Sequence, residues 1–340
     1  MTDLSAVLET LLAGSDLSAA QASAVMHALA SGEVPAAVAG GLLVALRSKG
    51  ETPDEVRGFA EAMRRLAVRP IVPAEGPPLV DTCGTGGDGS GSLNLSTAAA
   101  LVAAAAGVRV VKHGNRSISS RAGSADVLEA LGVPIEQGPE AAAACLERHG
   151  FCFLFAPRYH PAMGAVMPVR RALGVRTVFN VLGPLANPVA PPFQVVGAFS
   201  LQTAEMMAGA LSGLNVSRAF VVHGALGWDE ATPIGPFHLF DVRPGSVDHH
   251  QRDPADVGVP RCSAADLAGG DAATNAAALE AMLAGERGAH RDAATLSAGL
   301  ALEVTGVASD WQVGIGLAQE AIDSGRTSAL LAGLRAEESG

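Results

Sequence analysis

The chain has 340 residues, enough for one large domain or two domains of ordinary size. Hydrophobic residues make up 49% of it and aromatic residues only 4%, so we expect a core packed by small and branched aliphatic side chains. A formal net charge of −11 disfavours a nucleic-acid partner. The sequence contains no apolar run long enough to cross a bilayer, so no membrane partner is expected.

The cysteines and the first residues bear on where the protein works. Cys83, Cys145, Cys152 and Cys262 show neither the spacing of a metal site nor the density of a disulfide scaffold. Residues 1–5 lack the basic region of a secretory signal. We therefore expect reduced thiols and a cytoplasmic location.

The first part of the chain predicts helices. Apolar residues recur every three or four positions over residues 4–70, beginning with 4–12. Thr52–Glu55 is a capping box with proline at the first helical position. The proline-rich segment 69–78 indicates a linker. We predict a small all-helical N-terminal domain over residues 1–72.

Strands and helices alternate after the linker, which predicts an α/β domain over residues 73–340 with a mainly parallel central sheet flanked by helices. An antiparallel orientation is also open for the last strand. The proline-rich segment 161–192 interrupts the alternation, and a long surface loop is one interpretation of it. The expected strands cover residues 79–80, 108–112, 151–155, 194–199, 219–223 and 237–242.

Asp81–Thr97 is the most informative segment. It leads from a short apolar strand through a glycine-rich loop into an alanine-rich helix. Such a loop lets backbone N–H groups point at an anion, and the helix start adds further N–H groups, so the segment predicts a phosphate-bearing ligand. Asn94, Ser96 and Thr97 are expected to supply a cap and hydroxyls at the helix start.

Two other interpretations of the loop are weaker. A plain strand-to-helix turn does not need so many glycines. A dinucleotide fingerprint is matched by Gly84, Gly86 and Gly89, but it requires an acidic residue about 20 positions later. Residues 112–116 stand there instead and are basic or polar.

A second cluster follows the strand at residues 108–112. Because the chain as a whole is acidic, a local cluster of donors favours a specific anion pocket over a solvated basic loop. The cluster comprises Lys112, His113, Asn115, Arg116 and Arg121.

Together these segments resemble the anthranilate phosphoribosyltransferase family, and the resemblance extends over nearly the whole chain. The order of so many motifs makes it specific. The matching residues are Gly84–Asp88, Asn94–Thr97, Lys112–Arg116, Gly123–Asp126, Arg170, Thr177–Pro188, His223–Gly224 and Asp229–Glu230.

The resemblance implies a pentosyl transfer from 5-phosphoribosyl 1-diphosphate to the amino group of anthranilate, with release of diphosphate, in tryptophan biosynthesis. Lys112 and Arg170 would be the catalytic residues. The residues implied for phosphoribosyl diphosphate are Gly84, Gly87, Asp88, Ser92, Asn94, Leu95, Ser96, Thr97, Lys112, Asn115, Arg116, Ser117, Ser119, Ser120 and Ser124.

The same resemblance implies an acceptor site, a metal site and a hinge. Arg170 would pair with the anthranilate carboxylate, while Arg171 and Arg176 are expected to be surface residues. Segment 161–192 would return to the helical domain as part of a hinge, and the N-terminal helices would form a homodimer. The acceptor residues would be Gly84, His113, Asn115, His160 and Arg170, and Ser96, Asp229 and Glu230 would hold Mg²⁺, two ions per subunit.

Other functions fit less well. A pyrimidine nucleoside phosphorylase has a similar architecture, but such chains are longer and lack the block over residues 180–188. A non-catalytic nucleic-acid-binding relative would carry a basic groove, which the acidic composition disfavours. A dinucleotide oxidoreductase ranks last.

Overall fold

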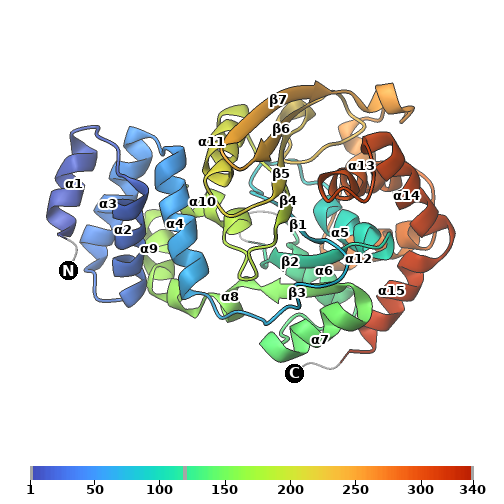
Figure 1. Ribbon diagram of the computed structural model, residues 1–340, viewed down its shortest axis with the longest axis horizontal. Coiled ribbons are helices and arrows are strands. Elements are labelled where there is room, and N and C mark those ends of the chain that lie inside the picture. Colours follow the sequence, from blue (N-terminus) through green and yellow to red (C-terminus); the bar gives the residue numbers. More distant parts are fainter. Residues whose placement is uncertain (1–2, 118–120, 338–340) are drawn as a thin grey trace.

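The computed structural model describes residues 3–117 and 121–337. Four helices form a bundle at one end of the molecule (Figure 1). The last of them begins with the predicted capping box, in which Thr52 and Glu55 satisfy each other's backbone N–H groups. The four are α1 (Leu4–Leu12), α2 (Ala19–Ser31), α3 (Ala36–Lys49) and α4 (Pro53–Leu66).

A seven-stranded sheet lies beside the bundle in the order β3-β2-β1-β4-β5-β6-β7. Pairing is parallel from β3 to β5 and antiparallel for the last two strands, so the predicted, mainly parallel sheet is confirmed. The strands are β1 (Leu79–Gly84), β2 (Arg109–Gly114), β3 (Phe151–Phe155), β4 (Phe193–Gly197), β5 (Arg218–His223), β6 (Phe237–Arg243) and β7 (Ser246–Arg252).

Helices cover both faces of the sheet. One buried cluster joins the sheet to α5 and the C-terminal helices. A second runs from the bundle through α11 to the opposite face, where it includes Val196, Val221 and Phe240. The longer helices are α5 (Leu95–Ala105), α6 (Ser124–Ala130), α7 (Pro139–His149), α11 (Leu201–Ser212), α12 (Ala272–Leu283), α13 (Ala289–Val304), α14 (Trp311–Asp323) and α15 (Arg326–Arg335).

Segment 161–192 packs against the bundle. Its helices contact α2, α3 and α4, and Val178, Phe179 and Leu182 are buried in the same cluster as the bundle. A domain boundary at residue 72 and a hinge role for this segment remain predictions. Its elements, with the short ones elsewhere, are α8 (Ala156–Tyr159), η1 (Pro161–Ala165), α9 (Met167–Leu173), α10 (Phe179–Leu182), η2 (Gly183–Leu185), η3 (Ala225–Gly227), η4 (Pro254–Val257) and η5 (Ala264–Leu267).

A buried carboxylate joins this segment to the sheet. Asp81 on β1 is fully buried and accepts a hydrogen bond of 2.8 Å from the side-chain amide of Asn187. The same amide donates to the Val111 carbonyl on β2, and the backbone N–H of His113 donates to Asp81 at 3.3 Å. Burial raises the pKa of Asp81 to about 6. Arg64 of α4 adds a bond of 2.6 Å to the Leu185 carbonyl.

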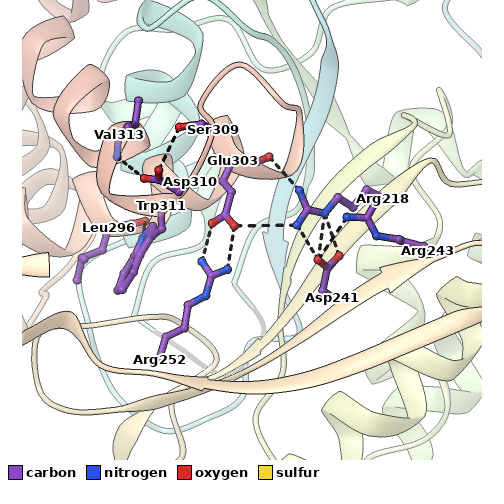
Figure 2. A network of polar contacts seen from close by, with 10 residues as sticks. All are labelled: Arg218, Asp241, Arg243, Arg252, Leu296, Glu303, Ser309, Asp310, Trp311 and Val313. Atoms are coloured by element: carbon purple, nitrogen blue, oxygen red, sulfur yellow. Dashed lines mark hydrogen bonds and ion pairs between the residues drawn. The ribbon is translucent and has the colours of Figure 1, made fainter. Parts of the chain in front are cut away.

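An ion-pair network fastens the antiparallel end of the sheet to α13 and α14 (Figure 2). Arg218 at the start of β5 binds Asp241 of β6 at 2.6 Å, and its guanidinium also donates to the Glu303 carbonyl of α13. Arg252 of β7 binds the Glu303 carboxylate in a two-pronged contact and lies over the Trp311 ring. These contacts hold β7, whose own residues are almost all exposed.

Two further observations concern the chain as a whole. In the described parts of the chain, the helices are too short or too polar to cross a bilayer. All four cysteines are free thiols.

Candidate active site

Three glycines let an acidic loop lie directly on the ends of the central strands. Gly84 ends β1 and pairs with Gly197 at the end of β4, and Gly224 follows β5. A Cβ atom added at Gly197 would lie 1.6 Å from the backbone oxygen of Asp229, and one at Gly224 would lie 2.0 Å from that of Glu230. Only glycine permits this approach, which places both acids at the carboxyl edge of the sheet, where ligands bind in such folds.

The glycine loop turns back toward the same acids. Its backbone N–H at Gly86 donates to the Asp229 carboxylate at 2.6 Å, and the Asp229 N–H donates to Asp88 at 3.3 Å. The left-handed backbone that these bonds require is available to glycine at low cost. The loop glycines in that region are Gly86, Gly87, Gly89 and Gly91, with φ of 62°, 71°, 74° and 64°.

Three acids lie close together here: Asp229 is buried, and Asp88 and Glu230 are partly buried. Burial, reinforced by the neighbouring carboxylates, raises the pKa of Asp229 to about 7 and that of Glu230 well above its usual range. Glu230 accepts from the Ser96 N–H at 3.0 Å with one oxygen, while its other oxygen is buried without a partner among the described residues. A cavity of about 30 Å³ lies against Ser96 and both acids.

This donor set fits a hard cation. Carboxylate and hydroxyl oxygens are the ligands that Mg²⁺ prefers, and the unpartnered Glu230 oxygen marks a place for positive charge. Among the described residues, no group of three or more His, Cys, Asp or Glu side chains is placed so that it could hold a metal ion by itself. An ion held here would therefore also need oxygens from water or from a ligand.

Lys112 supplies a cation next to the acids. Its side chain is 2% exposed, and its ammonium donates to the Thr82 carbonyl at 2.7 Å and lies 3.5 Å from the Ser96 hydroxyl. Burial lowers the pKa of Lys112. The Thr97 hydroxyl in the first turn of α5 is buried and has no partner in the described structure.

Contrary to the prediction, Asn94 does not cap α5 with its side chain. It stands at the N-cap of α5, but its side chain makes no cap hydrogen bond. Its amide instead donates to the Ala122 carbonyl at 3.1 Å, and its oxygen accepts from Asn275 at 2.9 Å. Both polar ends of the Asn94 side chain are therefore used by partners distant in sequence instead of by the helix start. Through the bond to Ala122, Asn94 joins the end of the glycine loop to the second cluster.

The second cluster is held by acids of α6. Arg116 pairs with Asp126 at 3.0 Å and Glu129 at 2.7 Å, and the Ser117 N–H donates to Asp126. The Ser124 hydroxyl donates to the Asn115 carbonyl at 3.4 Å. Ser119 and Ser120 lie outside the described residues.

A separate group of side chains lies toward the bundle. The rings of His113 and His160 are 5.0 Å apart, and burial lowers their pKa values to about 3 and about 4, so both are neutral at pH 7. Arg170 on α9 stacks over Phe179 at 5.0 Å, and burial lowers its pKa. Within the part of the chain that is described, Arg170 has no carboxylate partner.

Comparison with known proteins agrees with this geometry. The helical bundle domain of the glycosyl transferase family matches residues 5–67, and the a/b domain of that family matches residues 76–328. The anthranilate phosphoribosyltransferase of Solibacter usitatus is 50% identical over 314 residues, which are 92% of each chain. This chain belongs to the anthranilate phosphoribosyltransferase family.

Solved structures of family members have the same fold. The anthranilate phosphoribosyltransferase from Thermus thermophilus is 46% identical, with a TM-score of 0.90 over 98% of this chain and all of that one. The family member from Saccharomyces cerevisiae in complex with PRPP and Mg is 27% identical, with a TM-score of 0.89 over 97% of this chain and 96% of that one.

Sequence reasoning missed two contacts around the glycine loop. Arg176 is exposed, as predicted, but its guanidinium also donates to the Gly87 carbonyl. Asn275, which supports Asn94, is 2% exposed and accepts from the Gly270 N–H at 2.6 Å. Nothing in the spacing of Asn275 signals this, whereas Arg176 follows the expected acceptor residue by only six positions.

The close approach at β4 gives a stability prediction. Gly197→Ala places a methyl group on the Asp229 backbone, which cannot rotate away, so we expect a loss of about 3 kcal/mol or more in the free energy of unfolding. Gly86→Ala is the matched control, because it meets open space and costs only the left-handed backbone, about 1–2 kcal/mol. Urea unfolding measures both. Equal losses would mean that the strand-end approach is not a constraint.

Proposed function

We propose that this chain transfers the phosphoribosyl group of 5-phosphoribosyl 1-diphosphate to the amino group of anthranilate. The C1–O bond to diphosphate breaks, a C1–N bond forms, and the amine loses a proton. The observation that carries the proposal is the acidic pair held on glycine-terminated strands, facing a glycine loop and a buried lysine. We expect anthranilate fluorescence to disappear only when both phosphoribosyl diphosphate and Mg²⁺ are added. Unchanged fluorescence would contradict the proposal.

The glycine loop, the start of α5 and Lys112 are proposed to hold the phosphate groups. Backbone N–H groups and short hydroxyls bind phosphate oxygens without adding bulk. Lys112 reaches the same place as a buried charge, which makes its attraction for a leaving diphosphate stronger than it would be in water. Support comes from the position of Ser96, within 3.5 Å of Lys112 and bonded through its N–H to Glu230.

Ser96, Asp229 and Glu230 are proposed to hold Mg²⁺, two ions per subunit, with Asp88 close by. Bound Mg²⁺ would offset the charge that gathers on the departing diphosphate. The residues themselves fix the shape of the site, since Asp229 is buried, Glu230 is partly buried and both carboxylates accept from backbone N–H groups. Support for a cation comes from the raised pKa of both acids and from the unpartnered Glu230 oxygen.

Arg170, His113 and His160 are proposed to bind anthranilate, with Gly84 and Asn115. A guanidinium lacking a carboxylate partner can form a two-pronged pair with the anthranilate carboxylate. The two histidines are neutral, so they line an aromatic acceptor without competing for that carboxylate. The amine would then face the sugar across Gly84.

We also propose a cytoplasmic homodimer. The outer face of the bundle carries an apolar groove of about 450 Å³ between α3 and α9, where Gly40 and Gly41 leave space. Leu12 and Val44 are exposed on neighbouring helices. A second copy of the chain would cover these apolar groups. A nucleic-acid partner is still not expected.

Arg170→Ala should weaken the binding of anthranilate far more than the binding of phosphoribosyl diphosphate. Loss of a charge-assisted contact costs about 1.5–3 kcal/mol, so we expect the KM for anthranilate to rise about tenfold to a hundredfold. Steady-state kinetics with each substrate varied in turn measures the two values. Arg171→Ala, an exposed neighbour on α9, should leave both unchanged. An equal rise in both KM values would place Arg170 outside the acceptor site.

Asp229→Asn combined with Glu230→Gln should cut kcat at least about a hundredfold. The reason is that negative charge on the departing diphosphate grows in the transition state, and the Mg²⁺ that these groups would hold offsets it. The Mg²⁺ concentration needed for half-maximal rate should rise. Thermal stability should not fall, since ionised buried acids are costly to the fold. Near-normal turnover with an unchanged Mg²⁺ titration would show that the pair has no part in metal binding.

A further inference from the structure

Arg176 connects three parts of the molecule that the proposed reaction would use. It lies between α9 and α10, in the same segment as Arg170. Its guanidinium donates to the Gly87 carbonyl and lies 4.3 Å from the ring centre of Phe199, just beyond β4. Its own carbonyl accepts a bond of 2.6 Å from Arg47 of α3. The bundle and the glycine loop therefore meet at one residue, the bundle through its backbone carbonyl and the loop through its guanidinium.

The contact falls at a point where the loop most needs support. Gly87 has a left-handed backbone and lies between the two residues whose bonds reach Asp229, namely Gly86 and Asp88. Glycine loses more conformational freedom than any other residue when it is ordered, so such a loop does not keep one shape unaided. A donor on the Gly87 carbonyl fixes the peptide that separates these two bonds.

The loop is anchored at the same place from its other side. The Phe199 N–H donates to the Thr85 hydroxyl at 3.2 Å, and the Thr85 N–H donates to the Gly197 carbonyl at 3.0 Å. Arg176 stacks on the ring of this same Phe199. The guanidinium thus spans the start of the loop and its middle, which a planar group with several donors does more completely than an ammonium.

We propose that Arg176 is a positioning residue, which holds the glycine loop in the shape that binds phosphate and ties that shape to the helical bundle. The inference rests on the proposed function, because it assigns phosphoribosyl diphosphate to the loop. Arg176 acts through Gly87 and has no carboxylate partner among the described residues, so its charge also favours an anion on the loop. Loss of the Arg176 guanidinium should weaken the binding of phosphoribosyl diphosphate and leave the binding of anthranilate unchanged.

The test compares Arg176→Met and Arg176→Lys with Arg171→Met in the full-length enzyme. Methionine keeps a stem that packs on Phe199 but removes the donor. We expect Arg176→Met to raise the KM for phosphoribosyl diphosphate about tenfold, with less than a twofold change in kcat and in the KM for anthranilate. Arg176→Lys should recover part of the loss, and Arg171→Met should match the wild type.

Calorimetric titration of phosphoribosyl diphosphate with Mg²⁺ provides a second readout and should show the same tenfold loss for Arg176→Met. The inference is overturned if this variant behaves like Arg171→Met, or if the KM values for both substrates rise by the same factor. A wild-type enzyme without transferase activity would refute the proposed function instead. Titration with phosphoribosyl diphosphate would still test Arg176 in that case.

Discussion

The carboxylate of Asp81 is the interaction on which the site's arrangement depends. It is buried on the central strand and takes one hydrogen bond from the neighbouring strand and one from Asn187, which belongs to the segment that packs on the bundle. A buried acceptor of this kind is costly when unpaired, so each of its donors is held firmly. The backbone at Lys112 and His113 and the segment that carries Arg170 are in this way fixed to one point of the sheet.

Much of the fold could be predicted because its signals are local. The capping box at Thr52 and the apolar strand at Phe151–Phe155 depend on residues close together in the chain. The strand β7 could not be predicted, because its residues are polar except for Val247 and neither alternate nor form an apolar run. It is ordered by contacts that are distant in sequence, such as the pair between Arg252 and Glu303.

The site also contains features that the sequence could predict and features that it could not. The glycine loop and the acidic pair could be found in the sequence because each is contiguous and unusual in composition. That Asp229 lies over Gly84 and Gly197 follows only from the strand order β1-β4-β5, which no spacing contains. The capping role predicted for Asn94 was wrong for a related reason, since Asn275, which lies far along the chain, donates to its side-chain oxygen. A contact between distant residues leaves no local mark.

The second buried cluster has a consequence for how the chain folds. It extends from the bundle through α11 to one face of the sheet, so it contains residues from both of the matched family domains. A fragment starting after the linker would expose the apolar surfaces of α11 and of that sheet face to water. We therefore expect that the larger domain does not fold on its own. Loss of the bundle should abolish cooperative unfolding rather than merely remove one wall of the site.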